Sequence, residues 1–297
     1  MSAFFQRIVA FFLSVVAFFS GLFGVKKPAQ YAYGSNKRQR VNIMLPDNAE
    51  NTTVGLIFFI HGGGWTSGDM SAYDDAIKQA VKMGYAAAAM NYRYISDDSH
   101  CAEILDDIDA ALRQVKETAA KKDITIKKAL LTGSSAGAHL SLLYAYSRAD
   151  SAPITPAAVV SNCSPTDIGD PAFINENAAG GTELMLDLIG KLCGVKLSTA
   201  EYTAKNGSYD AWLAAVEKVS PASYVTAKSV PTVIAHGKKD TIVPYSNALL
   251  LDAKFTAAGV RHDFVSFPNS GHELGSDPDC STRVYELMIE YAQAYLK

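Results

Sequence analysis

Short apolar runs alternate along most of the chain with amphipathic segments in which apolar residues recur at helical spacing. This alternation is typical of strand–helix–strand units, in which a helix connects two parallel strands. Several runs are continuously apolar, as strands buried on both faces are. The sequence therefore predicts an α/β fold with a mostly parallel sheet flanked by helices, and strands at about 41–45, 54–60, 86–90, 129–132, 157–160, 232–235 and 263–267.

The helices that cover this sheet are expected where the apolar period is close to 3.6 residues. One region interrupts the alternation: residues 165–230 contain no strand candidate but hold helical segments at about 183–192 and 209–219. A structureless loop of that length is improbable in a compact domain, so this region is predicted to be a helical cap insertion. The remaining helices are expected at about 72–83, 104–115, 136–148, 246–258 and 284–295.

The N-terminal segment has a different composition. Residues 8–25 are almost wholly apolar, with Arg7 before them and Lys26 and Lys27 after them. The stretch is about long enough to cross a bilayer, and it also has the charged start and apolar middle of a secretory signal. We therefore expect a hydrophobic anchor or signal at 1–25, a connector at 26–39 and the folded domain at 40–297. The protein is expected to be membrane-anchored or secreted, with the side of the membrane left open.

Charge and cysteine usage exclude several classes of function. The chain has 27 Lys+Arg against 30 Asp+Glu, a formal net charge of −3, without a run of five like charges. Nucleic acid is therefore not an expected partner, whereas a small molecule is. The cysteines show no C-x-x-C and no metal-ligand spacing, so no structural metal is expected. We expect all four cysteines, Cys101, Cys163, Cys193 and Cys280, to be buried or free thiols, and a Cys101–Cys280 bridge stays open as an alternative.

The sequence Gly-Ser-Ser-Ala-Gly at 133–137 follows an apolar strand and opens a helix, which is the context of a nucleophile elbow. Glycines are needed on both sides because a serine on so sharp a turn crowds its neighbours two positions away. Ser135 is the candidate nucleophile, while Ser134 is expected to face away. The alternative is a helix start made of small residues that only caps the helix.

The sequence His-Gly-Gly-Gly-Trp at 61–65 ends another apolar strand. Glycine lets the backbone come close to a reacting carbonyl and direct its N–H groups at a developing oxyanion. We predict that Gly63 and Gly64, together with Ala136 after the nucleophile, form an oxyanion hole. Trp65 is an alternative to one of these donors and a candidate substrate contact. The competing interpretations are a flexible turn or a phosphate-binding loop, although no G-K-[ST] or G-x-G-x-x-G is present.

A serine nucleophile needs a base and a carboxylate that orients it. Asp240 and His272 follow the last two predicted strands, in the chain order Ser, Asp, His. Asp263 and Glu273 are rival carboxylates. The histidines of the glycine loop and of the elbow helix, His61 and His139, are expected to support backbone instead.

Five segments together resemble the α/β-hydrolase carboxylesterases: HGGGW at 61–65, NYR at 91–93, GSSAG at 133–137, HGKKDTIVP at 236–244 and SGHE at 270–273. The resemblance spans about 40–297 and is closest to the hormone-sensitive-lipase-like enzymes and the bacterial feruloyl or acetyl xylan esterase-like (BD-FAE) group. It implies the α/β-hydrolase fold with an eight-stranded sheet and a cap, no metal or organic cofactor, and an acyl-enzyme on Ser135.

The chain departs from that pattern in two places. The elbow reads GSSAG where hormone-sensitive-lipase-like members usually carry GDSAG, and the acid lies in a DTIVP context more similar to the xylan-esterase-like and peptidase-like branches. The expected function is a serine esterase acting on short-chain or small acyl esters. An amidase, formamidase or aminopeptidase on the same scaffold, or a non-catalytic binding protein, are the alternatives. Acyl length, alcohol group and oligomeric state are left open.

Overall fold

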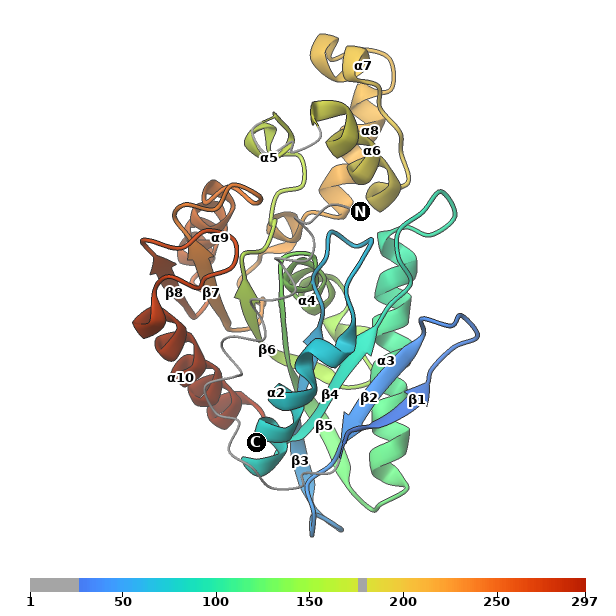
Figure 1. Cartoon of the computed structure of the whole chain (residues 1–297), viewed down its shortest axis with the longest axis vertical. Coiled ribbons are helices and arrows are strands. Elements are labelled where there is room, and N and C mark those ends of the chain that lie inside the picture. The colour runs from blue at the N-terminus through green and yellow to red at the C-terminus, as the bar shows by residue number, and fades with distance from the viewer. Residues whose placement is uncertain (1–26, 176–180) are drawn as a thin grey trace.

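A computed structural model describes residues 27–175 and 181–297. Its centre is an eight-stranded sheet with the order β1-β2-β4-β3-β5-β6-β7-β8 (Figure 1). The β1–β2 and β2–β4 pairs are antiparallel and all other pairs are parallel, which is the α/β-hydrolase fold that the sequence predicts. The strands are β1 Ala29–Ala32, β2 Arg40–Met44, β3 Thr53–Ile60, β4 Ala86–Asn91, β5 Thr125–Ser134, β6 Thr155–Asn162, β7 Thr232–Gly237 and β8 His262–Phe267.

Each of the seven predicted strands overlaps an observed one, but strand β1 was not predicted. It lies within residues 26–39, which were expected to be a connector, and it pairs with β2 alone. Three of its four residues are exposed, because an edge strand needs no continuous apolar run. The first strand of the sheet therefore begins at residue 29, within the segment expected to be a connector.

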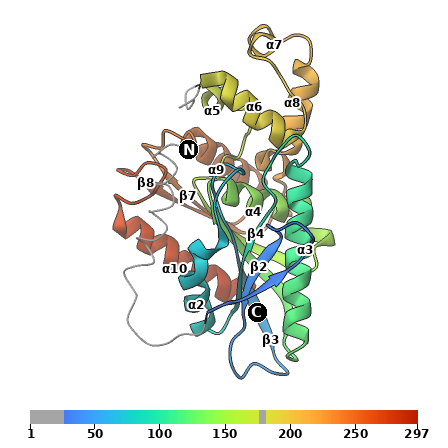
Figure 2. The ribbon, with the colours of Figure 1, turned by 45° about the vertical axis from the view of Figure 1, so that its right-hand side comes forward.

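Helices cover both faces of the sheet. In β3, Leu56, Phe58 and Ile60 face one layer of the core, and Ile57 and Phe59 face the other. Both layers consist of buried apolar side chains, which explains why the central strands are apolar without interruption. The first face is covered by α3 (Cys101–Ala120), α4 (Ala136–Ser147) and α9 (Ser246–Ala258), and the second by α2 (Asp74–Lys82) and α10 (Pro278–Tyr295), as Figures 1 and 2 show.

The segment between β6 and β7 forms a helical layer at one end of the molecule (Figures 1 and 2). In it, Trp212 is 1% exposed and contacts the rings of Tyr202 and Tyr209, at centroid distances of 5.8 and 6.0 Å. The buried side chains of this segment continue the core that lies on one face of the sheet. The helices are α5 Pro171–Asn175, α6 Gly181–Cys193, α7 Thr199–Ala204 and α8 Tyr209–Lys218, inside the expected insertion at 165–230.

Two other predictions concern the N-terminus and the cysteines. The apolar segment 8–25 lies outside the described residues, so the anchor or signal stays a prediction. Across 27–175 and 181–297, no helix combines the length and apolarity needed to cross a bilayer. All four cysteines are free thiols, and Cys101 and Cys280 do not form a bridge.

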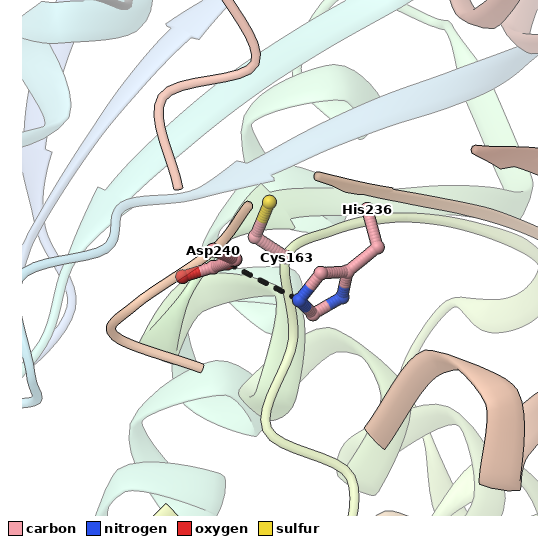
Figure 3. Close-up of side chains that lie close together, drawn as sticks. All are labelled: Cys163, His236 and Asp240. Carbon is pink, nitrogen blue, oxygen red and sulfur yellow. Dashed lines mark ion pairs between the residues drawn. The ribbon is translucent and has the colours of Figure 1, made fainter. Parts of the chain in front are cut away.

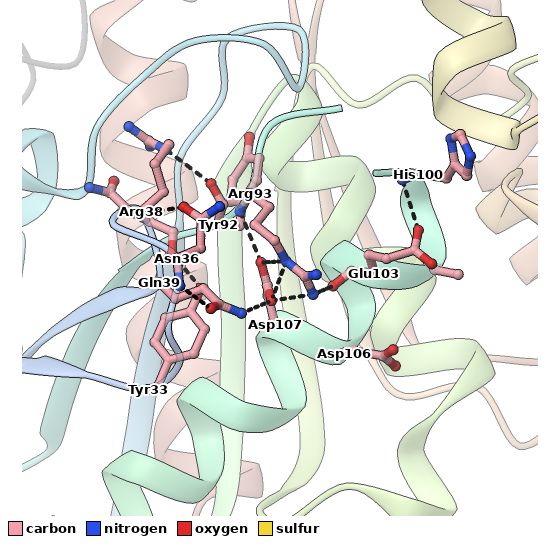
Figure 4. A network of polar contacts seen from close by, with 12 residues as sticks. Tyr33, Asn36, Arg38, Gln39, Tyr92, Arg93, His100, Glu103, Asp106 and Asp107 are labelled. Carbon is pink, nitrogen blue, oxygen red and sulfur yellow. Dashed lines mark hydrogen bonds and ion pairs between the residues drawn. The ribbon is translucent and has the colours of Figure 1, made fainter. Parts of the chain in front are cut away.

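A buried ion pair joins the β1–β2 hairpin, β4 and α3 (Figure 4). Asp107, on α3, has a side chain that is 1% exposed. Its carboxylate accepts hydrogen bonds from Arg93 at Nη2 (2.7 Å), at Nε (3.0 Å) and at the backbone N–H (2.9 Å), and from Gln39 Nε2 (2.8 Å). A buried charge with this many donors is fully compensated, so removing either partner leaves the other unpaired.

We expect Asp107→Ala to lower the free energy of unfolding by about 3–5 kcal/mol, because Arg93 would be left without its partner. Asp106→Ala is the matched control, since the Asp106 side chain is 63% exposed and pairs with Arg148 at the surface. The Asp106→Ala substitution should lower the free energy of unfolding by at most about 1 kcal/mol. Urea unfolding of both variants measures the difference, and equal losses would contradict this assignment.

Candidate active site

Ser135 stands at a sharp turn between β5, which ends at Ser134, and α4, which begins at Ala136. Its φ of 55° and ψ of −125° are unfavourable for a residue with a Cβ. A Cβ on Gly133 or Gly137 would collide with the carbonyl oxygen of Ile60 at the end of β3. The two glycines therefore allow the elbow to press against β3, as the sequence pattern requires.

The glycine loop after β3 runs directly beside this elbow. A Cβ on Gly62 would lie 2.6 Å from the carbonyl oxygen of Ser134 and 3.4 Å from Cβ of Ser135. Gly63 and Gly64 follow with φ values of 112° and 58°, which glycine adopts at low cost. Gly62 therefore lies against the elbow, and the two residues predicted for the oxyanion hole follow it directly in the loop.

The carbonyl groups of His61, Gly62 and Gly63 in this loop are held by protein donors. Tyr92 Oη donates to the oxygen of His61 (2.9 Å), and His61 Nδ1 donates to that of Gly62 (2.8 Å). The oxygen of Gly63 accepts from Ser67 Oγ (2.8 Å) and from two backbone N–H groups. A trans peptide points its N–H away from its carbonyl, so the N–H groups of Gly63 and Gly64 face the opposite way. Within 27–175 and 181–297 these two N–H groups have no hydrogen-bond acceptor.

Trp65 lies in the core and not on the surface of the site. Its indole is 2% exposed, and Nε1–H donates to Nδ1 of His139 on α4 (3.2 Å). The other ring nitrogen of His139 donates to the carbonyl of Val219 (2.7 Å). Burial lowers the pKa of His139 to about 4, so the ring stays neutral. It can therefore accept from the Trp65 indole with one nitrogen and donate to the Val219 carbonyl with the other. The Trp65 side chain thus anchors the glycine loop to the elbow helix.

Asp240 and His272 lie on the turns that follow β7 and β8. His272 Nδ1 donates to Asp240 Oδ2 at 2.8 Å, and both side chains are at most 5% exposed. Asp240 Oδ1 accepts from the backbone N–H groups of Ile242 (2.8 Å) and Val243 (2.9 Å). Burial alone raises the pKa of Asp240, but the hydrogen bonds from His236 and His272 outweigh it and hold the pKa well below 3.8. The carboxylate stays charged, and Nε2 of His272 is left as the basic nitrogen.

Two further side chains, His236 and Cys163, surround this carboxylate (Figure 3). His236 Nε2 lies 3.1 Å from Asp240 Oδ2 and donates to the carbonyl of Val243 at 2.9 Å. The ligand atoms of Cys163, His236 and Asp240 lie within 4.8 Å of one another. However, Nε2 of His236 carries a proton, and Oδ2 of Asp240 is shared with His272. Burial also raises the pKa of the Cys163 thiol well above 9.0. These groups therefore support the carboxylate, and we assign no metal to them.

The strand order places these residues along one edge of the sheet. Ser135 follows β5, Cys163 follows β6, and the turns carrying Asp240 and His272 follow β7 and β8, which are consecutive neighbours. Backbone bonds connect the strand ends, from the Ser135 N–H to the oxygen of Asn162 and from the Cys163 N–H to that of Ala235 (both 2.8 Å). The elbow and the Asp–His pair are thus brought to the same edge. The rival carboxylate Asp263 instead accepts from Tyr291 Oη at 2.7 Å.

Sequence reasoning missed His236 and Arg38 as parts of this site. The sequence places His236 only at a strand end, four residues before Asp240, and the HG-x-x-D spacing is the signal that could have found it. Arg38 lies among the basic residues that follow the apolar N-terminal segment, and it contacts the glycine loop through His61. No local signal indicates this contact.

Comparisons with known proteins identify the family and the fold. A BD-FAE family model matches residues 41–255, which is more than half of the chain. The chain is similar to esterase LipQ of Mycobacterium tuberculosis, with 25% identity over 232 residues, 76% of this chain and 52% of LipQ. It is also 25% identical over 215 residues, 68% of this chain and 45% of the other, to the probable carboxylic ester hydrolase LipM of that organism. The chain spans about half the length of these curated relatives.

Solved structures share the fold at lower identity. An inhibited esterase B from Lactobacillus rhamnosis aligns with a TM-score of 0.73 and 21% identity, over 97% of this chain and 93% of that one. A truncated carbohydrate esterase from gut microbiota aligns with a TM-score of 0.68 and 24% identity, over 90% and 100%. The thermophilic esterase Est2 from Thermogutta terrifontis, in its propionate-bound form, aligns at 0.66 and 21%, over 89% and 93%.

Gly137→Ala should destabilise the protein by about 3 kcal/mol, the upper end of the usual cost of overpacking, because the new Cβ would meet the backbone oxygen of Ile60, which cannot move without breaking β3. Gly84→Ala is the control: Gly84 has a positive φ (88°), so alanine is strained there, but no atom lies within 4 Å of the added Cβ. Its cost should be about 1–2 kcal/mol. Thermal unfolding compares the two, and a Gly137→Ala protein as stable as Gly84→Ala would show that the elbow is not this tight.

Proposed function

Because the chain belongs to the BD-FAE family, we propose that it is a serine carboxylic-ester hydrolase that works through an acyl-enzyme on Ser135. The observation that carries the proposal is the 2.8 Å hydrogen bond between Asp240 and His272, at the sheet edge that also holds the strained Ser135 elbow. A hydroxyl alone is a weak nucleophile, and this pair is the arrangement that can remove its proton.

In the first step, His272 Nε2 takes the proton of Ser135 while Oγ attacks the ester carbonyl carbon. Asp240 holds the ring with Nδ1–H toward itself and stabilises the imidazolium that forms. The carboxylate is suited to this because three hydrogen bonds, from two backbone N–H groups and His272, keep it ionised. The carbon–oxygen bond to the alcohol then breaks, and His272 returns the proton to the leaving alcohol.

The negative charge of the tetrahedral intermediate is held by backbone N–H groups. Gly63 and Gly64 direct theirs away from carbonyls that protein donors hold, and Ala136 adds the N–H at the start of α4. A helix N-terminus favours the same sign of charge. We assign Trp65 to positioning this loop, because its indole is bonded to His139 within the core.

Water completes the cycle along the same path. His272 removes a proton from water, hydroxide attacks the acyl carbon, and the acid leaves as Ser135 regains its hydrogen. The ring nitrogen that serves as base in one half of the cycle serves as acid in the other. No group beyond the chain and water is needed for this sequence of steps.

The packing of side chains in the cap favours an ester with a small acyl group as the substrate. Apolar side chains that could line a long acyl tunnel are packed inside it: Phe173, Leu186, Leu192 and Trp212 are each at most 3% exposed. We therefore propose short-chain or small acyl esters as substrates. The relatives named as esterases support the class of reaction and not the acyl group.

Ser135→Ala should lower the hydrolysis of p-nitrophenyl acetate by several orders of magnitude, because the members of a triad act as one unit. Ser134→Ala is the matched control and should stay within about threefold of the wild-type rate, as expected for a substitution outside the site. Stopped assays with purified variants measure both. If Ser135→Ala retains at least a tenth of the activity, the nucleophile is misassigned.

The acyl preference is a separate prediction. Among acetyl, butyryl, octanoyl and feruloyl esters, we expect kcat/KM to be highest for a short or small acyl group, because Phe173, Leu186, Leu192 and Trp212 are buried in the core and do not line an apolar tunnel. Rates that rise steadily to the longest chain would contradict this. Aryl-formamide and dipeptide substrates in the same series identify a preference for amides, which use the same machinery.

A further inference from the structure

Arg38, in the turn between β1 and β2, is bonded to the backbone around the glycine loop. Its Nε donates to the carbonyl of Tyr92 (3.0 Å), and its Nη2 donates to the carbonyl of Gly68 (3.1 Å) and to Nε2 of His61 (3.1 Å). Its Cζ lies 3.9 Å from the ring centroid of Tyr94. Figure 4 shows Arg38 directed toward Tyr92, apart from the Arg93–Asp107 pair. A planar guanidinium that bridges three acceptors is held in one orientation.

The contacts on both sides of the His61 ring, with Arg38 and with the carbonyl of Gly62, fix which nitrogen carries the proton. Arginine can only donate, so Nε2 of His61 must accept, and the proton is on Nδ1. Nδ1–H then donates to the carbonyl of Gly62 at 2.8 Å. The ring stacks on Tyr92 with a centroid distance of 4.3 Å, and burial lowers the pKa of His61 to about 4. At neutral pH the ring is therefore uncharged and locked in one tautomer.

The tautomer in turn fixes a peptide plane of the glycine loop. Because the Gly62–Gly63 peptide is planar, a carbonyl held by His61 directs the Gly63 N–H to the other side. Rotation of a peptide between two glycines is sterically easy, so the sequence by itself does not choose its orientation. If this peptide rotated, a carbonyl oxygen would take the place of the Gly63 N–H on the side away from His61.

We propose that Arg38 is a positioning residue for the oxyanion hole: it holds His61 as the Nδ1–H tautomer and so keeps the Gly62–Gly63 peptide in the donating orientation. The inference rests on the proposed function of Ser135. It adds a residue from the N-terminal hairpin, 97 positions before the nucleophile in the printed sequence, to the machinery of the site.

The alternative is that Arg38 only fastens the β1–β2 hairpin to the body of the protein. Such a role would lower stability and affect substrate binding and turnover alike. A role in orienting the oxyanion donor lowers kcat, because that interaction forms in the transition state and not with the bound ester. The two roles are therefore separable by kinetics and by the protonation state of His61.

The kinetic experiment uses the full chain with Arg38→Ala, Arg38→Lys and Arg40→Ala, assayed on p-nitrophenyl acetate. Loss of one oxyanion donor costs about 10²–10³ in kcat, so Arg38→Ala should lose about 10²-fold with KM within about threefold. Arg38→Lys should recover little, because one ammonium cannot bridge three acceptors. Arg40→Ala should match the wild type, since the Arg40 side chain donates only to the carbonyls of Asn36 and Gln39 in its own hairpin.

Chemical rescue tests the geometry directly. Guanidinium ion at non-denaturing concentration should raise kcat of Arg38→Ala at least about tenfold, because it supplies the same planar donor, and should leave Arg40→Ala unchanged. ¹⁵N NMR of the histidine rings reports the tautomer independently of activity. The wild type should show His61 protonated at Nδ1, and Arg38→Ala should show protonation at Nε2 in a substantial fraction of molecules. The His61 signals are assigned by their loss in His61→Asn.

Each outcome decides between the interpretations. An Arg38→Ala protein that keeps kcat within about threefold, or that loses activity only through KM, overturns the proposal. So does a wild-type His61 protonated at Nε2, a result that does not depend on any variant folding. If the wild type hydrolyses none of the esters, the proposed function fails instead, and the NMR result still decides whether Arg38 sets the tautomer.

Discussion

The contact between the last carbonyl of β3 and two glycines of the elbow determines the geometry of the site. Ser135 holds a backbone conformation that costs about 1–3 kcal/mol, and such strain persists only where the surroundings impose it. Here the surroundings are the parallel pairing of Ile60 with Gly133, and the bond from the Ser135 N–H to Asn162. The central strands β3, β5 and β6 therefore fix the direction of one side chain, while the helices on both faces keep those strands in place.

At the sheet edge that carries Ser135, the hydrogen-bonding groups of the glycine loop and of Asp240 are arranged in different ways. Around the glycine loop, the carbonyls of His61, Gly62 and Gly63 are occupied by protein donors, so the N–H groups are the ones left to face a reacting ester. On the far side of the elbow, Asp240 is buried but charged, because backbone N–H groups and His272 compensate it. Both arrangements consist of the protein's own groups, so the proposed mechanism needs little reorganisation when charge develops in the transition state.

The sequence predicts most of the sheet because strands covered on both faces must be apolar, as the uninterrupted runs of β3 and β4 are. It could not predict β1, an exposed edge strand with a polar pattern. The motifs around Ser135, Asp240 and His272 were recognisable, because the tight turns need glycine and the chemistry needs particular residue types. Whether those residues act together as proposed is for experiment to decide.

Contacts between distant residues explain what the sequence did not indicate. Arg38 reaches His61 and Tyr92 across 23 and 54 positions, and nothing in its neighbours marks it as different from the other basic residues of that segment. Trp65, predicted to touch substrate, is buried against His139, because the direction of an aromatic ring after a glycine run depends on a φ of 59° that no local pattern encodes. These positions are governed by packing and not by propensity.

The most direct measurement is a crystal structure of the protein after reaction with a short-chain alkyl fluorophosphonate, whose adduct resembles the tetrahedral intermediate. The account predicts phosphorus bonded to Oγ of Ser135 and a phosphoryl oxygen about 2.7–3.1 Å from the N–H nitrogens of Gly63, Gly64 and Ala136. It also predicts Nε2 of His272 within hydrogen-bonding reach of the adduct. Phosphorus on another residue, or a phosphoryl oxygen turned away from the glycine loop, would contradict it.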